Sequence, residues 1–153
     1  MSGKSIRKEL ERTRDEILSF FDLEESALVL TYEPGKWSVK ELLHHLTDAE
    51  TVLYERIRRA IAKPGQVVWG FDQDAWAEVL NYKEVPLDTN KAIFMSIRAA
   101  IIDLAERFYI SKGDNFYIHN ETGNRHLSEE FDKVVWHSDH HLEQIRKALK
   151  KVK

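Results

Sequence analysis

The sequence predicts an all-α protein, a four-helix bundle built as a single domain over residues 1–153. Helix breakers are rare, because the chain holds only 6 Gly and 3 Pro. Four long segments repeat apolar residues at spacings of three and four, which is the pattern of an amphipathic helix. With 153 residues and 42% hydrophobic content, the chain can bury one core. A short extra helix and a long loop before the last helix complete the prediction.

The first half of the chain is expected to hold two long helices and one short helix. The first covers Ser5 to Phe21, where apolar residues form one stripe. The second begins at Ser38, because Glu41 three residues later completes a capping box, and Pro64-Gly65 ends it. The segment Asp72–Trp76 then starts the short extra helix.

The second half is expected to hold the other two long helices, separated by a polar stretch. Asp88 can cap the third helix. The stretch from Ser111 to Leu127 is polar and contains Asn and Gly, so it indicates a loop or a small hairpin. Ser128 is then the expected cap of the last helix.

Charge and composition exclude several classes of protein. The net charge of -3 gives no attraction to nucleic acids or anionic membranes. No apolar run approaches the roughly 20 residues of a membrane span, and the charged N-terminus does not resemble a secretory signal. Cysteine is absent, which excludes disulfides and thiolate ligands. We therefore expect a cytoplasmic protein without a nucleic-acid or membrane partner.

Three histidines are placed so that they could share a metal ion. His137 and His141 are four residues apart on the last helix, so both imidazoles lie on one face, about 40° apart at 100° per residue. They sit at the edge of the apolar stripe. His45 has the same position on the second helix, whereas His44 and His140 are expected to point away, His44 toward solvent or a partner. The three imidazoles meet only if the two helices are neighbours.

Spacing alone leaves a metal-free role for these histidines open. A histidine at a core edge is most often hydrogen-bonded and structural, and many pairs four residues apart lie on exposed polar faces. No His-Glu-x-x-His pattern is present, so that type of metalloprotease is not indicated.

Two segments that carry these histidines resemble motifs of the DinB-like superfamily, most closely its YfiT-like branch. They are Lys36–Glu50 and Trp136–Ile145, and Gly70–Trp76 is similar to the central segment of that family. The resemblance implies a four-helix bundle, often a homodimer, in which three histidines hold a divalent metal. Carried over residue by residue, the metal ligands fall on His45, His137 and His141.

The resemblance also implies an activity. Members are usually described as metal-dependent hydrolases, and some relatives resemble S-transferases that use low-molecular-weight thiols such as bacillithiol or mycothiol. Three imidazoles suit zinc, nickel, iron or manganese and leave the metal an open position for water or a thiol. The expected substrate is a small electrophile. A non-catalytic, stress-associated dimeric bundle that binds a metal or a small molecule remains the alternative.

Three further residues are candidates for supporting the site. Gln144 lies one heptad after His137, on the same face. Asp48 could orient an imidazole, or it could be a solvated acid. Arg56, on nearly the same bearing as His45, is suggested to bind an anionic group of the substrate or thiol, with a surface ion pair as its alternative. The tryptophans are expected to be core or pocket walls: Trp37, Trp69, Trp76 and Trp136.

Overall fold

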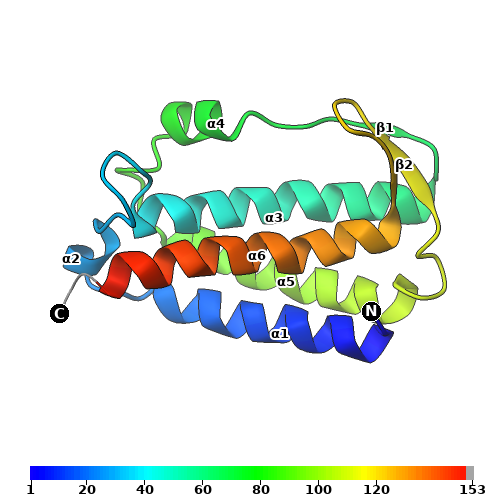
Figure 1. Ribbon diagram of the computed structural model, residues 1–153, viewed down its shortest axis with the longest axis horizontal. Coiled ribbons are helices and arrows are strands. Elements are labelled where there is room, and N and C mark those ends of the chain that lie inside the picture. Colours follow the sequence, from blue (N-terminus) through cyan, green and yellow to red (C-terminus); the bar gives the residue numbers. More distant parts are fainter. Residues whose placement is uncertain (151–153) are drawn as a thin grey trace.

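Four long helices form the body of the protein, as a computed structural model shows (Figure 1). The structure describes residues 1–150; Lys151, Val152 and Lys153, at the end of the predicted last helix and domain, lie outside the described residues. The long helices are α1 (Gly3–Phe20), α3 (Val39–Ala62), α5 (Asp88–Phe108) and α6 (Leu127–Leu149). The predicted fold class is therefore confirmed. Within residues 1–150, no helix is both long and apolar enough to cross a membrane.

The order of the helices around the bundle differs from their order in the chain. α3 packs against α5 and α6, and α1 packs against the same two helices, so α1 and α3 are diagonally opposite. α3 and α6 lie side by side and run in opposite directions (Figure 1). This pairing brings the helix that carries His45 against the helix that carries His137 and His141.

The predicted cap of α3 is confirmed, and the predicted short helix has a side-chain cap as well. At α3, the Ser38 Oγ accepts from the Glu41 N–H at 3.2 Å, and the Glu41 carboxylate accepts from the Ser38 N–H at 3.2 Å, which closes the capping box. At α4 (Gln73–Val79), the Asp72 Oδ1 accepts from the Ala75 N–H at 3.0 Å. Both caps fix the start of a helix whose residues surround the candidate site.

The other two predicted caps are wrong. α5 follows Leu87, so Asp88 is already in its first turn rather than at the cap. α6 follows His126 instead of Ser128, because a strand leads directly into the helix. The Glu129 carboxylate accepts from the His126 N–H at 2.7 Å and satisfies this helix start.

Residues 63–87, called the strap here, cross the outside of α3 and return the chain to the end where α5 begins (Figure 1). The strap holds β1 (Val67–Val68) and α4. The polar stretch before α6 is a hairpin of β2 (Phe116–His119) and β3 (Gly123–His126), with β1 added in parallel to β2. The polar stretch indicated a loop or a hairpin, whereas no sequence pattern indicated β1 or the short α2 (Glu25–Leu28).

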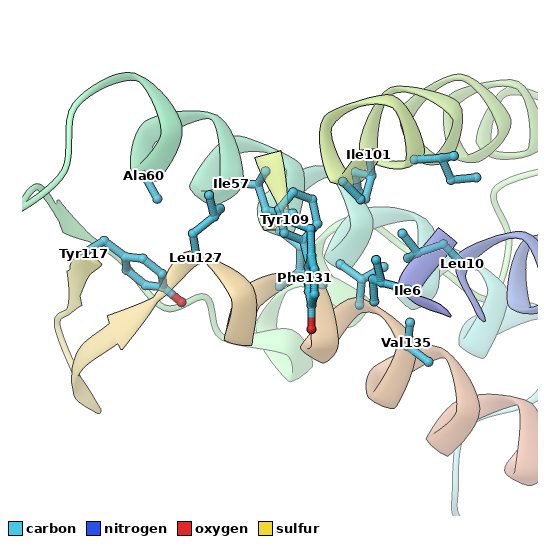
Figure 2. Packing of buried hydrophobic residues seen from close by; sticks show 14 of the residues in the cluster. Ile6, Leu10, Ile57, Ala60, Ile101, Tyr109, Tyr117, Leu127, Phe131 and Val135 are labelled. Atoms are coloured by element: carbon cyan, nitrogen blue, oxygen red, sulfur yellow. The ribbon is translucent and has the colours of Figure 1, made fainter. Parts of the chain in front are cut away.

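The bundle core consists of two apolar clusters, one toward each end. Figure 2 shows the cluster nearer the hairpin, where Ile6, Leu10, Ile57 and Phe131 are buried together and Tyr117 extends the packing under the hairpin. The second cluster lies at the α2 end and includes Ile17, Leu42, Phe94 and Leu142.

A buried ion pair joins all four long helices. The Arg98 guanidinium on α5 bonds both oxygens of the Glu50 carboxylate on α3. It also donates to the Leu10 carbonyl at 2.9 Å, to Thr13 Oγ1 at 2.8 Å and to Ser138 Oγ at 2.9 Å. All five guanidinium N–H groups therefore have an acceptor, and the pair fixes α3 and α6 at the level of the histidines.

Candidate metal centre

Three imidazoles converge in the seam between α3 and α6. The Nε2 atom of His137 lies 3.0 Å from His45 Nε2 and 3.2 Å from His141 Nε2. Ring nitrogens of the three residues all lie within 4.8 Å of one another. The structure thus brings together the same three histidines that helix periodicity and the family resemblance select.

The histidines owe their approach to ordinary helix geometry. His137 and His141 are one turn apart on α6, so their rings meet edge-on in the seam, with centroids 4.5 Å apart. His45 enters from the first half of α3, which runs antiparallel to α6. His45 and His141 are buried and His137 is partly buried. The seam therefore shields nitrogen donors while leaving one edge of the cluster toward solvent.

Burial keeps all three imidazoles uncharged at neutral pH. Together with the neighbouring His141, it lowers the pKa of His45 to about 3 and that of His137 to about 2. Burial also lowers the pKa of His141 to about 4, against the opposing effect of its hydrogen bond to Gln144. Neutral imidazole is the form that binds metals, so the site is held in its ligand form.

The hydrogen bonds around the cluster also suit a cation. Gln144 Oε1 lies 2.7 Å from His141 Nδ1. An amide oxygen only accepts, so this bond places the proton on Nδ1 and leaves the His141 Nε2 lone pair facing His137. Nitrogen ligands of a tetrahedral zinc ion are about 3.3 Å apart, given Zn–N bonds of about 2.0–2.1 Å. The Nε2 distances of 3.0 Å between His137 and His45 and 3.2 Å between His137 and His141 are close to that spacing, so these residues fit a divalent metal.

Aromatic rings surround His45 on the sides away from α6. The Trp37 ring centroid lies 4.9 Å from that of His45, and the Phe71 centroid lies 6.3 Å away. Trp76 packs against Phe71 at 4.8 Å. His45 Nδ1 is buried and has no hydrogen-bond partner among residues 1–150. Phe71 and Trp76 of the strap thus form an apolar cover over His45.

The predictions for the tryptophans hold only in part. Trp37 and Trp76 are partly buried beside His45, as pocket walls would be. Trp69 is 72% exposed, so the prediction is wrong for this residue. Trp136 is also mostly exposed, although it lines a small cavity beside α6.

His44 was expected to face solvent or a partner, and this expectation is wrong. The residue is buried, its Nε2–H donates to the Val85 carbonyl at 2.8 Å, and its ring stacks on Tyr82 at 5.1 Å. The strap folds back over this face of α3, which helix periodicity does not reveal. His140 is exposed and is not one of the three clustered histidines, but it does not point fully away: its ring stacks on Trp136 and meets the His141 ring edge-on, with centroids 4.9 Å apart.

The three supporting candidates have different surroundings. Gln144 contacts His141 directly. Asp48 accepts a hydrogen bond from the Tyr82 hydroxyl, so it anchors the strap rather than an imidazole. Arg56 does not form a surface ion pair. It is 3% exposed, and it donates to the Trp69 carbonyl at 2.9 Å and to Glu130 at 3.5 Å.

Two anchors of the strap, His44 and Tyr82, were missed as contributors to the site. Each joins the strap to α3 through a partner that is remote in sequence, Val85 for His44 and Asp48 for Tyr82. A contact between a helix and a distant loop leaves no periodic signal. Locally, only the adjacent pair His44 and His45 indicated that two faces of α3 carry polar contacts.

Comparison with known proteins places the chain in a family. The model of the DinB superfamily matches residues 9–145. A protein of Oceanobacillus iheyensis named "putative metal-dependent hydrolase" is 29% identical over 127 residues, which cover 83% of this chain and 73% of that protein. A protein of Halalkalibacterium halodurans with the same description is 25% identical over 131 residues, covering 86% of this chain and 76% of its own length.

A solved structure has the same fold. YfiT from Bacillus subtilis, described as a "probable metal-dependent hydrolase with an unusual four-helix bundle topology", superimposes with a TM-score of 0.89 at 20% identity. The match covers 99% of this chain and 89% of that chain. The extent of the family match establishes that this chain belongs to the DinB superfamily.

Proposed function

We propose that this chain is a metal-dependent enzyme that acts on a small molecule, with a divalent cation bound by His45, His137 and His141. The observation that carries the proposal is the convergence of three neutral imidazole nitrogens in one buried seam. The names of the relatives, putative metal-dependent hydrolases, support it. Zinc, nickel, iron and manganese are all compatible with imidazole ligands.

The chain's own residues account for the setting of the reaction. A divalent cation with three protein ligands keeps an open position and lowers the pKa of water or of a thiol placed there. Gln144 fixes the tautomer of His141. Trp37 and Phe71 exclude water from the His45 side. A substrate therefore approaches from the His137 side, where the cluster is partly exposed.

Two activities share this arrangement, hydrolysis and thiol S-transfer to a small electrophile. The chain has no cysteine, so a thiol nucleophile has to come from a low-molecular-weight compound. Metal-loaded protein mixed with a model electrophile, with and without such a thiol, separates the two. Turnover that requires the thiol identifies transfer, and turnover without it identifies hydrolysis. Because the chain resembles a family whose members are often homodimers, we extend the proposal to a cytoplasmic homodimer. Light scattering measures the mass of the assembly.

Elemental analysis of untagged protein tests the metal ligands. We expect about one divalent metal per chain, lost in His45→Ala and in His137→Ala. The matched control is His140→Ala, an exposed histidine on the same helix but outside the cluster, which should keep its metal. Full metal content in a His141→Ala variant that is still folded would refute the assignment.

A further inference from the structure

A cavity lies one helical turn away from the histidine cluster, between the β2–β3 hairpin and α6. It has a volume of about 270 Å³. Tyr117 and His119 of β2 line one side, and Lys133 and Trp136 of α6 line the other, with Arg125 of β3 at the hairpin. Figure 2 shows Tyr117 under the hairpin, close to the start of α6.

The acidic groups of this cavity already have donors within the protein. The Glu129 carboxylate accepts from the His126 N–H at the start of α6. The Glu130 carboxylate accepts from the Tyr117 hydroxyl and from the buried guanidinium of Arg56. These bonds engage Glu129 Oε2 and both oxygens of Glu130, and within residues 1–150 neither carboxylate bonds Lys133 or Arg125.

The cations, in contrast, have spare donors. Lys133 is exposed and has no hydrogen bond or ion pair with any residue in the described part of the chain. Within the residues that the structure describes, Arg125 donates only from Nε, to Thr122 Oγ1 at 3.3 Å, which leaves its terminal N–H groups available. Together these two side chains offer two positive charges to the same small volume.

His119 adds a neutral donor whose tautomer is fixed. Its Nδ1 accepts from the backbone N–H groups of Glu121 at 3.1 Å and Thr122 at 3.3 Å. The ring proton is therefore on Nε2. Burial, with the nearby charges of Arg56 and Lys133, lowers the pKa of His119, so the ring stays uncharged and Nε2–H remains a donor at neutral pH.

The charge of the cavity favours an anion with a single charge. In the lining, Lys133 and Arg125 balance the carboxylates of Glu129 and Glu130. The guanidinium of Arg56, which contacts Glu130 at 3.5 Å from outside the lining, adds one positive charge. A carboxylate matches that charge, whereas a phosphate dianion would exceed it. The ring of Trp136 gives an apolar wall beside these donors.

The cavity is close enough to the histidine cluster to hold one end of the same molecule. Lys133 precedes His137 by one helical turn, about 6 Å along the axis of α6. Trp136 directly precedes His137 and is largely exposed. A molecule of a few bonds can therefore reach from this cavity to the partly exposed edge of His137.

We propose that this cavity binds the carboxylate of a monoanionic small molecule through Lys133, Arg125 and the Nε2–H of His119. The molecule is assigned as the substrate or thiol co-substrate of the histidine centre, and this second assignment rests on the proposed function. The carboxylate anchors one end, and the reacting atom lies at the histidine cluster.

Titration of the full chain with 3-phenylpropionate and with 3-phenyl-1-propanol, its neutral counterpart, tests the anion site. The backbone amide of Lys133 and the indole N–H of Trp136 report binding by NMR. We expect the acid to shift both signals and the alcohol to shift neither. Lys133→Gln should weaken acid binding tenfold or more, whereas Lys8→Gln, an exposed lysine on α1, should leave it unchanged.

Three results would overturn the site: equal binding of acid and alcohol, unchanged binding in Lys133→Gln, or tighter binding of inorganic phosphate. The titration is run with divalent metal and after its removal, and the acid should bind in both preparations. Binding that needs the metal would mean that the carboxylate sits on the cation, which contradicts the proposal. Because the test does not depend on turnover, its failure is distinct from failure of the proposed enzyme function.

A kinetic test then addresses the link to the centre. With a turnover assay for a carboxylate-bearing substrate, Lys133→Gln should raise KM tenfold or more while kcat changes less than twofold. The metal content of this variant should match that of the wild type. An unchanged KM would refute the assignment of this cavity to the substrate.

Discussion

Removing the Glu50 carboxylate should destabilise the whole bundle, because it leaves the Arg98 charge buried without its counterion. Arg98 is fully buried and Glu50 nearly so. Two of the five guanidinium N–H groups bond Glu50, and the other three bond Leu10, Thr13 and Ser138. In Glu50→Ala, two buried guanidinium N–H groups lose their acceptors. Breaking a buried pair in this way costs about 3–5 kcal/mol.

That cost is a large part of the total stability of a domain, which is about 5–15 kcal/mol. For a chain of this length, each kcal/mol lowers the Tm by about 2–4 °C, so Glu50→Ala should melt about 10 °C lower. Ser138 lies between His137 and His141 and receives one of the Arg98 bonds. A weakened ion pair should therefore also weaken metal binding, through a shift of α6 relative to α3.

Urea unfolding followed by far-UV circular dichroism measures this loss. The control is a double variant, Glu50→Leu with Arg98→Met, which replaces both charges by apolar groups of similar volume. We expect it to be more stable than Glu50→Ala, because no unpaired charge remains. The reasoning is refuted if Glu50→Ala unfolds within about 1 kcal/mol of the wild type, the range of a surface substitution.

Three other predictions follow from contacts around the site. Gln144→Leu removes the acceptor that orients His141, so competition with a chromogenic chelator should show metal affinity about 10–100-fold weaker; unchanged affinity would refute this role. Tyr82→Phe removes the hydroxyl bond to Asp48 and should cost about 1 kcal/mol in urea unfolding, with faster proteolysis within the strap; an unchanged cleavage rate would contradict its role as an anchor. Metal-free protein should become less stable as pH falls from about 6.5 toward 3. In this range the unfolded chain binds protons on His45 and His137, whereas the folded state, with pKa values of about 3 and 2, does not. The slope is about 1.4 kcal/mol per pH unit for each histidine, and a flat profile between pH 7 and 5 in urea titrations would contradict the lowered pKa values.

Most of the bundle could be predicted because its signals are local. The Ser38–Glu41 capping box and the Pro64-Gly65 stop are readable within a few residues, and both ends of α3 follow them closely. The start of α6 was placed two residues too late, because the strand before it enters the helix without a loop. β1 is only two residues long and exists through its pairing with β2, which no local pattern encodes.

The histidine cluster could be predicted for the same reason, because the face of a helix on which a residue lies follows from the local sequence alone. The direction in which a side chain points from its helix does not reveal which other helix packs there. His45 approaches His137 only because α3 and α6 pack together. The supporting residues show the limit of this reasoning. Arg56 was suggested to bind an anionic group or to form a surface ion pair, and His44 was expected to face outward. Each is instead covered by the strap, through Trp69 and Val85.

The different faces of α3 explain why these substitutions should have separable effects. His45 faces α6, Glu50 faces the buried Arg98, and His44 and Asp48 face the strap. Because each direction is held by a different element, loss of a strap anchor uncovers the His45 side without breaking the ion pair that sets the spacing of α3 and α6. Loss of the ion pair changes that spacing while the strap stays bonded to α3. A metal site that weakens in Glu50→Ala but keeps its affinity in Tyr82→Phe would therefore show that the helix packing, rather than the cover, positions the ligands.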